Sequence, residues 1–268
     1  MNNSLDIIIP AYNCASTLNR TLSSLEAQTD QNFNVSVIDD CSTEDILSII
    51  NEHSKRLSIR YIRNKENVGC GMTRQVGIDS TNAKYCTFLD SDDILMPYAV
   101  ETFNSCIENN PELEYMHSYF YEQTIIDGNP AIVLHKDGFT WCHGKLYSVD
   151  SLRKYNIRER PDIRWADDSY INSICAELMS MQVMPLPMML WTNTKTSVMR
   201  RNNPVRDAEA MRDFLQAMIF SCEHVLRYKS EISHLSRTIE IIENRLDSYG
   251  EIEMKLLEKL KKFKGGYV

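Results

Sequence analysis

The sequence lacks the features typical of disulfide-stapled, exported or membrane-spanning proteins. Its eight cysteines include no Cys-x-x-Cys pair and no zinc-knuckle spacing, so we expect buried, reduced thiols. The first apolar stretch contains Asp6 and follows no basic segment, so we expect no signal peptide. No apolar run approaches the roughly 18 residues that a membrane helix needs. Together these absences predict a cytoplasmic protein.

Positive charge is scarce relative to negative charge. Lys and Arg number 29 against 37 Asp and Glu, which gives a formal net charge of −8. A chain without a global positive field has no general attraction for DNA, RNA or anionic lipid. The 268 residues, 43% hydrophobic and 25% charged, fit a globular protein with one large domain, alone or with an appendage.

The first hundred residues alternate short strand and helix patterns. Apolar, β-prone runs near 5–9, 35–38, 59–62 and 85–89 predict strands, the first of which we expect to end at Pro10. Helices are predicted between these runs, the second of them capped by Ser42. This alternation predicts a Rossmann-like, mostly parallel α/β sheet with helices on both faces. Its carboxyl edge would gather the loops at 10–13, 39–42 and 90–93.

The later part of the chain has a different pattern. Residues 115–123 and 131–134 flank turn residues and predict a hairpin in a mixed sheet, and a helix is predicted from 167 to about 179. Long helices are predicted over 208–228 and 231–261, which we expect to pack on the main domain or to pair with another copy of the chain. The expected domains are residues 1–203, with halves 1–100 and 101–203, and a helical extension over 204–268.

Three carboxylates lie directly after the apolar run at 85–89. They are Asp90, Asp92 and Asp93. Hard divalent cations such as Mg²⁺ and Mn²⁺ prefer carboxylate oxygens and leave positions open for water or phosphate. A solvated acidic turn is the alternative, because acidic turns are common after strands.

Two more features further along the chain carry chemistry. Asp167 and Asp168 stand where the predicted helix begins, and a carboxylate can serve as a general base. The alternative is an ordinary helix start, because the helix dipole favours acidic residues in any first turn. His143 lies near Trp141 and is a candidate for an acceptor-side or metal site, with a purely structural role as the alternative.

Several separated motifs follow one another over roughly the first hundred residues. They are Ile7 to Asn13, Leu22 to Thr29, Val37 to Ser42, Asn67 to Ile78 and Leu89 to Pro97. In this order they resemble the start of family 2 glycosyltransferases of the GT-A fold, with looser similarity over 140–172 and 190–200. The resemblance implies a non-processive, inverting glycosyltransferase with a GT-A sheet.

The sequence departs from the family pattern at three places. Gln75 follows the arginine where Asn is more usual, and Cys41 follows the Asp pair where Gly is usual. Neither residue is charged, so we expect the loop shape to be retained. The later acidic motif is usually Glu then Asp, whereas here it reads Asp167, Asp168.

The resemblance implies roles on the donor side of the site. Pro10, Tyr12 and Asn13 would form the wall of a nucleobase pocket, and Asp40 would accept a hydrogen bond from uracil. For Tyr12 the alternative is packing at a strand end. Arg74 would meet the diphosphate or the nucleoside, because a guanidinium grips phosphate in a two-point fork. A surface helix arginine is its alternative.

The resemblance also implies roles at the reacting centre. Asp92 would hold Mn²⁺ or Mg²⁺ against the diphosphate, and Asp90 would contact the ribose, or the metal through water. Asp93 is expected to turn the loop or to bond backbone amides. Asp168 is our first choice for the general base that takes the acceptor proton, and Asp167 the second.

The expected function is metal-dependent, inverting transfer from a nucleotide-sugar, by preference a UDP-sugar, to a hydroxyl of an unidentified glycan, lipid, protein or modified nucleobase. A sugar nucleotidyltransferase is one alternative, but those enzymes carry a Gly-rich basic loop where this chain has Pro10 to Asn13. A non-catalytic nucleotide-sugar-binding protein of the same fold is another. The presence of Asp92 together with Asp167 and Asp168 argues against it.

Overall fold

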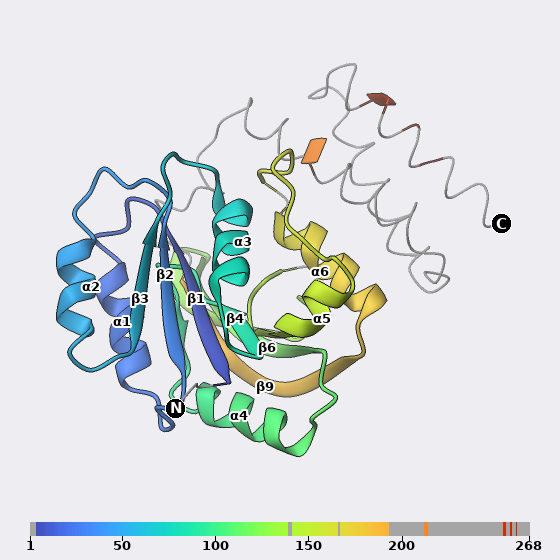
Figure 1. Cartoon of the computed structure of the whole chain (residues 1–268), viewed down its shortest axis with the longest axis horizontal. Helices are drawn as coiled ribbons and strands as arrows, with labels where there is room; N and C mark the ends of the chain where they lie inside the picture. The colour runs from blue at the N-terminus through green and yellow to red at the C-terminus, as the bar shows by residue number, and fades with distance from the viewer. Residues whose placement is uncertain are drawn as a thin grey trace.

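The computed structural model describes residues 4–138, 141–165 and 167–192, and beyond them residues 212–213, 254–255, 258 and 261 (Figure 1). The predicted helices over 208–228 and 231–261 lie outside the described residues except at those last positions, as does the expected pairing with a second copy. Within the described part, no helix is long and apolar enough to cross a bilayer. All seven cysteines described there are free thiols, as expected, but only four are buried: Cys41 and Cys106 are partly exposed and Cys70 is exposed.

A parallel half-sheet forms from the first four predicted strands. It contains β1 (Leu5–Ala11), β2 (Asn34–Asp39), β3 (Ile59–Arg63) and β4 (Tyr85–Phe88), in the order β3-β2-β1-β4. The strands are short and apolar and are joined through helices, which is the connection that parallel pairing requires. The prediction of a mostly parallel α/β sheet is confirmed for this half.

The second half extends the same sheet with mixed pairing. The order continues β4-β8-β6-β9-β5, and β7 pairs with β6 as the predicted hairpin. These strands are β5 (Ile94–Leu95), β6 (Tyr115–Ile126), β7 (Asn129–His135), β8 (Lys145–Ser148) and β9 (Met181–Thr192). β8 is antiparallel to both of its neighbours, whereas β9 is parallel to β6. One continuous sheet therefore runs through both predicted halves of the main domain.

Helices cover both faces of the sheet, each over its own apolar core. They are α1 (Leu18–Glu26), α2 (Leu47–His53), α3 (Cys70–Ser80), α4 (Ala99–Asn109), α5 (Val149–Lys154) and α6 (Asp167–Leu178). Because side chains alternate along a strand, Ile7 and Ile9 of β1 join the core under α1 and α4, whereas Ile8 joins the core under α3 and α6. Figure 1 shows α1 and α2 on one side of the strands and α3 with α6 on the other.

Pro10 does not end β1 as expected, because the strand continues to Ala11 with Pro10 paired to Ile38. The Ile8 carbonyl points toward β4, where it accepts from Leu89 at 3.1 Å, so the nitrogen of Pro10, two residues on, faces the same side. The last β4 pairing with β1 is at Ile8. The missing N–H of Pro10 therefore costs no bond in the ladder.

The expected cap of the second helix is also wrong. The helix α2 begins at Leu47 rather than directly after Ser42. Asp45 instead accepts from the Ser48 N–H at 3.2 Å and from its hydroxyl at 2.6 Å. The Ser42 hydroxyl is taken by the N–H of Asn13, which holds the loop to the end of β1.

Two glycines let α3 lie against both the sheet and α6. A Cβ on Gly77 would come within 2.4 Å of the Ile8 side chain, and a Cβ on Gly71 would come within 2.7 Å of the Asp167 Cβ. Any larger residue at these positions would push the helix away from its neighbours. Arg74, between these two glycines, is thereby placed beside the start of α6.

Candidate active site

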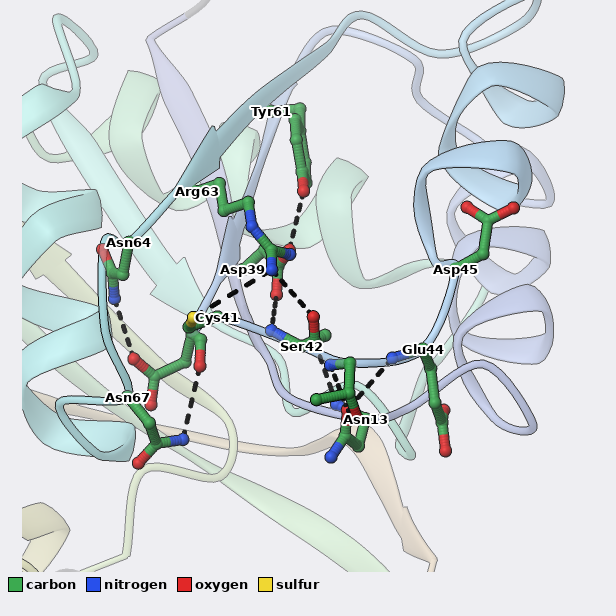
Figure 2. A network of polar contacts seen from close by, with 12 residues as sticks. Asn13, Asp39, Cys41, Ser42, Glu44, Asp45, Tyr61, Arg63, Asn64 and Asn67 are labelled. Atoms are coloured by element: carbon green, nitrogen blue, oxygen red, sulfur yellow. Dashed lines mark hydrogen bonds and ion pairs between the residues drawn. The ribbon is translucent and has the colours of Figure 1, made fainter.

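Asn13 ties together the loops that follow β1 and β2 (Figure 2). Its side-chain oxygen accepts from the N–H of Thr43 at 2.8 Å and from that of Glu44 at 3.3 Å. Its own N–H donates to the Ser42 hydroxyl at 3.0 Å, and its φ is 47°. Asn tolerates this left-handed conformation better than most residues.

Asp39 is a buried carboxylate that the chain itself satisfies. It accepts from the Ser42 N–H at 2.8 Å and from the Tyr61 hydroxyl at 2.7 Å, and it pairs with Arg63 (Figure 2). Burial alone would raise the pKa of Asp39, but hydrogen bonds from Ser42, Tyr61 and Arg63 outweigh burial and lower it. Sequence analysis gave Asp39 no role; in the structure it shapes the loop.

Asp40 is also buried and holds the loop that leads into α3. Its carboxylate accepts from the N–H groups of Val68 and Gly69 and from the Asn64 amide, each at 2.9 Å. Its backbone carbonyl accepts from Asn67 at 3.3 Å. The predicted contact with uracil therefore concerns a carboxylate that already accepts three hydrogen bonds within the chain.

The surroundings of Tyr12 and Pro10 differ. Tyr12, directly after β1, is 50% exposed, so packing at a strand end is not its role. Pro10 is buried within β1. Directly after Asp40, Cys41 takes a φ of 63°, the left-handed conformation that suits the glycine usual at this position.

Arg74 stands between two carboxylates. It is 4% exposed, which excludes the surface-arginine alternative. One terminal nitrogen donates to Asp167 at 2.5 Å and the other to Asp90 at 2.9 Å. The guanidinium also lies over the Phe88 ring, 5.7 Å from its centroid. Arg74 thus joins the carboxyl end of β4 to the first turn of α6.

The three carboxylates after β4 differ in how well their charge is compensated. Burial acts to raise the pKa of Asp90, but Arg74 and His143 outweigh it and the net shift is downward. Burial, together with Asp93 and Asp90, raises the pKa of Asp92 to about 7. Burial also raises the pKa of Asp93, although His143 opposes the shift. Asp92 and Asp93 therefore carry negative charge that the chain does not fully compensate.

Asp93 shapes the turn while facing His143. Its side chain is 0% exposed and accepts from the Thr192 N–H at 2.8 Å, and its carbonyl accepts from the Thr21 hydroxyl at 2.8 Å. These are the kinds of backbone contact expected for Asp93. Its other carboxylate oxygen lies 3.5 Å from the His143 Nε2.

His143 is held by aromatic rings and has unused nitrogens. Its ring stacks on Phe120 with centroids 5.0 Å apart and lies 5.2 Å from the Trp191 ring. Neither nitrogen has a hydrogen-bond partner among the described residues. Burial would lower the pKa of His143, but the negative charges of Asp93, Asp90 and Asp168 outweigh burial and raise it.

Asp90, Asp93 and His143 together form a candidate metal group. Each offers one ligand atom, and these atoms lie within 4.8 Å of one another. Two of the donors are carboxylates, which Mg²⁺ and Mn²⁺ prefer. The buried His143 nitrogens and one Asp93 oxygen lack hydrogen-bond partners, as expected of groups that would hold a cation. Asp92, the predicted ligand, lies in the same turn but outside this group.

The two carboxylates that open α6 have different partners. Asp167 is buried and paired with Arg74, and burial is the main cause that raises its pKa to about 6. Asp168 is half-buried and accepts from the Ser169 N–H at 2.9 Å. Burial raises the pKa of Asp168, while Arg74 and His143 act in the opposite direction. Asp168 thus lacks the ion pair that holds Asp167.

Glu159 is a buried carboxyl that sequence reasoning missed. Neither of its oxygens has a hydrogen-bond partner among the described residues, and burial raises its pKa well above the usual range. Its N–H donates to the Gln75 side chain at 2.9 Å. Gln75, where the family more often has Asn, thereby anchors the segment that carries Glu159. No motif around Glu159 could have revealed this.

Lys145 and His117 form a second buried pair that no pattern indicated. The Lys145 ammonium donates to the His117 Nδ1 at 2.6 Å and to the Gly138 carbonyl at 2.8 Å. Burial lowers the pKa of Lys145 to about 7 and that of His117 to about 4. The pair fastens the segment that precedes Trp141 and His143 to the sheet.

The structure places the predicted site residues in two groups along one edge of the sheet. The Asn64 amide donates to Asp40 at 2.9 Å and to Thr73 at 3.4 Å, and so ties Asp40 to α3, the helix that carries Arg74. The first group, after β1 and β2, contains Pro10, Tyr12, Asn13 and Asp40. The second group contains Arg74, Asp90, Asp92, His143, Asp167 and Asp168.

The mixed α/β sheet with its acidic carboxyl edge has the architecture of the GT-A fold. A sequence profile of glycosyl transferase family 2 matches residues 6–158, more than half of the chain. The protein therefore belongs to glycosyl transferase family 2.

Relatives with curated descriptions match parts of the chain. An uncharacterized glycosyltransferase of Haemophilus influenzae is 36% identical over 113 residues, which cover 42% of this chain and 37% of the relative. Chondroitin synthase of Escherichia coli is 39% identical over 98 residues, 36% of this chain and 14% of that enzyme. An uncharacterized glycosyltransferase of Rickettsia prowazekii is 24% identical over 262 residues, 96% of this chain and 73% of the relative. The chain thus spans well under half the length of the first two.

Solved structures share the fold. TarS of S. aureus, residues 1–349 in complex with UDP-GlcNAc, has a TM-score of 0.67 at 17% identity and covers 98% of this chain and 91% of that chain. The mannosyltransferase PcManGT of Pyrobaculum calidifontis, in complex with GDP-Man and Mn²⁺, has a TM-score of 0.58 at 13% identity, with 80% and 63% covered. At such identities the likeness establishes the fold alone.

Proposed function

We propose that the protein transfers a sugar from a UDP-sugar to an acceptor hydroxyl with inversion, with the help of a divalent cation. The observation that carries this proposal is the grouping of Asp90, Asp93 and His143 beside the Arg74–Asp167 pair and Asp168. It combines a cation-binding set with a carboxylate base at the carboxyl edge of a parallel sheet, where ligands of α/β folds bind.

The donor nucleotide is assigned to the loops after β1 and β2. Tyr12 is half exposed and offers an open aromatic face for a base, while Asn13 and Asp40 fix the loops around it. The TarS complexes with UDP and UDP-GlcNAc are those of another protein with this fold, and they favour a UDP-sugar here.

The cation is assigned to the turn after β4. Asp90, Asp93 and His143 are ligands in our proposal, because their ligand atoms lie within 4.8 Å of one another. Asp92, in the same turn, is the fourth ligand, because it is less buried than Asp93 and its charge is poorly compensated. Bound Mn²⁺ or Mg²⁺ would supply a Lewis acid for the departing diphosphate.

Arg74 orients carboxylates in this proposal. One of its terminal nitrogens donates to Asp167 and the other to Asp90. Arg74 therefore holds these two side chains in place rather than binding the diphosphate. Removing it would leave two carboxylates without their cation.

Asp168 is proposed as the general base. Asp167 is bound to Arg74, whereas Asp168 has no such ion pair, and burial together with the Asp90 charge raises its pKa. Asp168 takes the proton of the acceptor hydroxyl as the new bond forms to the anomeric carbon on the face opposite the nucleotide. A base on that face is what an inverting displacement needs.

The test is hydrolysis of UDP-GlcNAc, UDP-glucose and UDP-galactose by the full chain, with proton NMR to follow the anomer released. We expect Mn²⁺-dependent release of UDP from at least one of them, arrest by EDTA, and a first product of inverted configuration. Hydrolysis unaffected by EDTA, or a product of retained configuration, would contradict the proposal. GDP-mannose serves as the competing donor.

A further inference from the structure

The turn that precedes the Asp167–Asp168 pair is held by a residue far along the chain. One oxygen of the Asp213 carboxylate accepts from the Arg164 N–H at 2.6 Å and from the Trp165 N–H at 2.9 Å. Asp213 is only 7% exposed. Hydrogen bonds from amides to an ionised carboxylate are stronger than neutral ones, and they strengthen further away from water.

The Arg164–Trp165 turn lies just before α6, the helix that begins with Asp167 and Asp168. Trp165 lies two positions before Asp167, the first residue of α6. Asp167 is in turn fixed by Arg74 and by its close approach to Gly71. The place of Asp168 is therefore set from two directions, by Arg74 through Asp167 and by Asp213 through the turn.

The same turn also reaches the donor side. The Arg164 guanidinium donates to the Asn67 side-chain oxygen at 3.0 Å. The Asn67 amide donates to the Asp40 carbonyl at 3.3 Å. A chain of contacts thus runs from Asp213 through Arg164 and Asn67 to Asp40, and it joins the start of α6 to the loop assigned to the nucleotide.

We propose that Asp213 is a positioning residue, which holds the Arg164–Trp165 turn so that Asp168 stands at the reacting centre. This proposal rests on the proposed function, in which Asp168 is the base. Asp213 itself touches neither donor nor acceptor; it acts through the backbone of the turn. A displacement of the base by about 1 Å can cost on the order of 100-fold in rate, so the loss of this anchor should appear mainly in kcat.

The contacts of Asp213 and Arg164 allow an effect on kcat to be distinguished from an effect on donor affinity, whereas a general loss of structure would change both. Asp213 holds the backbone of the turn, whereas the Arg164 side chain reaches the donor loop. Truncation of Asp213 should therefore lower kcat with little change in donor affinity. Truncation of Arg164 should weaken donor binding while the backbone amides still bond Asp213.

The experiment measures Mn²⁺-dependent hydrolysis of the UDP-sugar that the wild type cleaves fastest, with UDP affinity by calorimetry. For Asp213→Ala we expect kcat to fall roughly 30-fold or more, with UDP affinity within about twofold. For Asp213→Asn we expect recovery to within about fivefold of wild type, because both amides converge on one oxygen and an amide oxygen can accept both. Arg164→Ala should raise the donor KM several-fold at nearly constant kcat. Asp162→Ala, an exposed carboxylate of the same segment, is the matched control.

Several outcomes would overturn the proposal. One is full activity in Asp213→Ala. Another is parallel loss of kcat and UDP binding in Asp213→Ala that Asp213→Asn does not relieve, which would show a merely structural role. If Asp213→Ala fails to fold, the proposal is still tested by the kcat of Asp213→Asn and by the donor KM of Arg164→Ala. Asp168→Asn is assayed alongside: if it stays active, the assignment of the base fails, whereas an active Asp213→Ala beside an inactive Asp168→Asn removes only the present proposal.

Discussion

Two groups of acidic side chains share the carboxyl edge of the sheet, and the chain treats them differently. Asp39 and Asp40, after β2, accept hydrogen bonds from loop amides and side chains, and the pKa of Asp39 is lowered despite burial, because those hydrogen bonds outweigh it. Asp92 and Asp93, after β4, are left with less compensation, and burial raises the pKa of both.

The comparison separates carboxylates that build the site from carboxylates that serve it. A buried carboxylate bonded within its own chain stabilises a loop. A buried carboxylate that lies near other negative charges lowers the stability of the fold. Such carboxylates are typical of sites that bind a cation or take up a proton. Asp92, Asp93 and Asp168 match the second description in that their pKa values are raised, whereas Asp90 and Asp167 share Arg74.

The largest expected effect is on catalysis at Asp168. Asp168→Asn removes the base but keeps the shape, so we expect hydrolysis or transfer to fall by roughly 100- to 10,000-fold while UDP affinity is retained. Steady-state kinetics and calorimetry measure the two quantities. Asp79→Asn, an exposed carboxylate on α3, is the control. Full activity in Asp168→Asn would move the role to another group.

Arg74→Met should have the largest effect on stability. It leaves Asp90 and Asp167 beside each other without their cation, and breaking a buried pair from one side costs about 3–5 kcal/mol. The loss should be greatest above pH 7 and should shrink below about pH 5 as the freed carboxylates take up protons. Urea unfolding across this pH range measures it. Arg158→Met, at an exposed ion pair with Asp79, should cost at most about 1 kcal/mol. Equal losses in the two variants would refute the central place of Arg74.

Asp39→Asn tests the first member of the comparison. Because the pKa of Asp39 is lowered in the folded state, its contribution is present above the unfolded pKa and is lost as the pH falls through the folded value. We expect Asp39→Asn to cost about 1–3 kcal/mol at pH 7 and less below pH 4. Thermal unfolding at both pH values is the measurement. A stable variant at pH 7 would show that the loop does not depend on this carboxylate.

Asp92→Asn should raise the stability of the protein freed of metal with EDTA, the opposite of the effect expected for Asp39→Asn. The pKa of Asp92 is raised to about 7 in the folded state, so the folded protein prefers the neutral carboxyl. Its contribution to the free energy of unfolding is therefore fully present below the unfolded pKa and is lost as the pH rises through 7. The variant should be more stable than wild type at pH 8, by a few degrees in Tm, and equal to it below about pH 4. Destabilisation at pH 8 would mean that the charge of Asp92 is compensated after all.

The first half of the fold was predictable because its strands are short, rich in apolar β-prone residues and alternate with helical segments, of which α1 has a clear apolar face. The second half was harder to predict. β9 contains Pro185 and Pro187, which argue against a strand, and it is accommodated by register shifts against β6 near Tyr119. β8 contains Lys145, and a lysine argues against a buried strand. The buried Lys145 side chain is bonded to His117, a partner that the sequence did not indicate.

The candidate site was foreseen as residues but not as contacts. Motif order indicated Arg74, Asp90 and Asp167, yet their pairing depends on Gly71 letting α3 approach α6, which no local pattern reveals. His143 was open between a structural and a metal-site role, and only the fold brings it beside Asp93. Glu159 is buried near charged groups distant in sequence, and Asp213 bonds a turn 48 and 49 residues earlier, so composition and spacing carried no signal for either.

The central claim is that the poorly compensated carboxylates after β4 bind a divalent cation with the nucleotide. Calorimetric titration of UDP, with and without Mn²⁺, into wild type, Asp92→Asn, Asp93→Asn and the exposed-site control Asp79→Asn tests it most directly. The account predicts that Mn²⁺ tightens UDP binding in wild type and in Asp79→Asn, tightens it less in Asp93→Asn, and has no effect in Asp92→Asn. Equal tightening in wild type and Asp92→Asn, or no effect of Mn²⁺ on wild type, would contradict it.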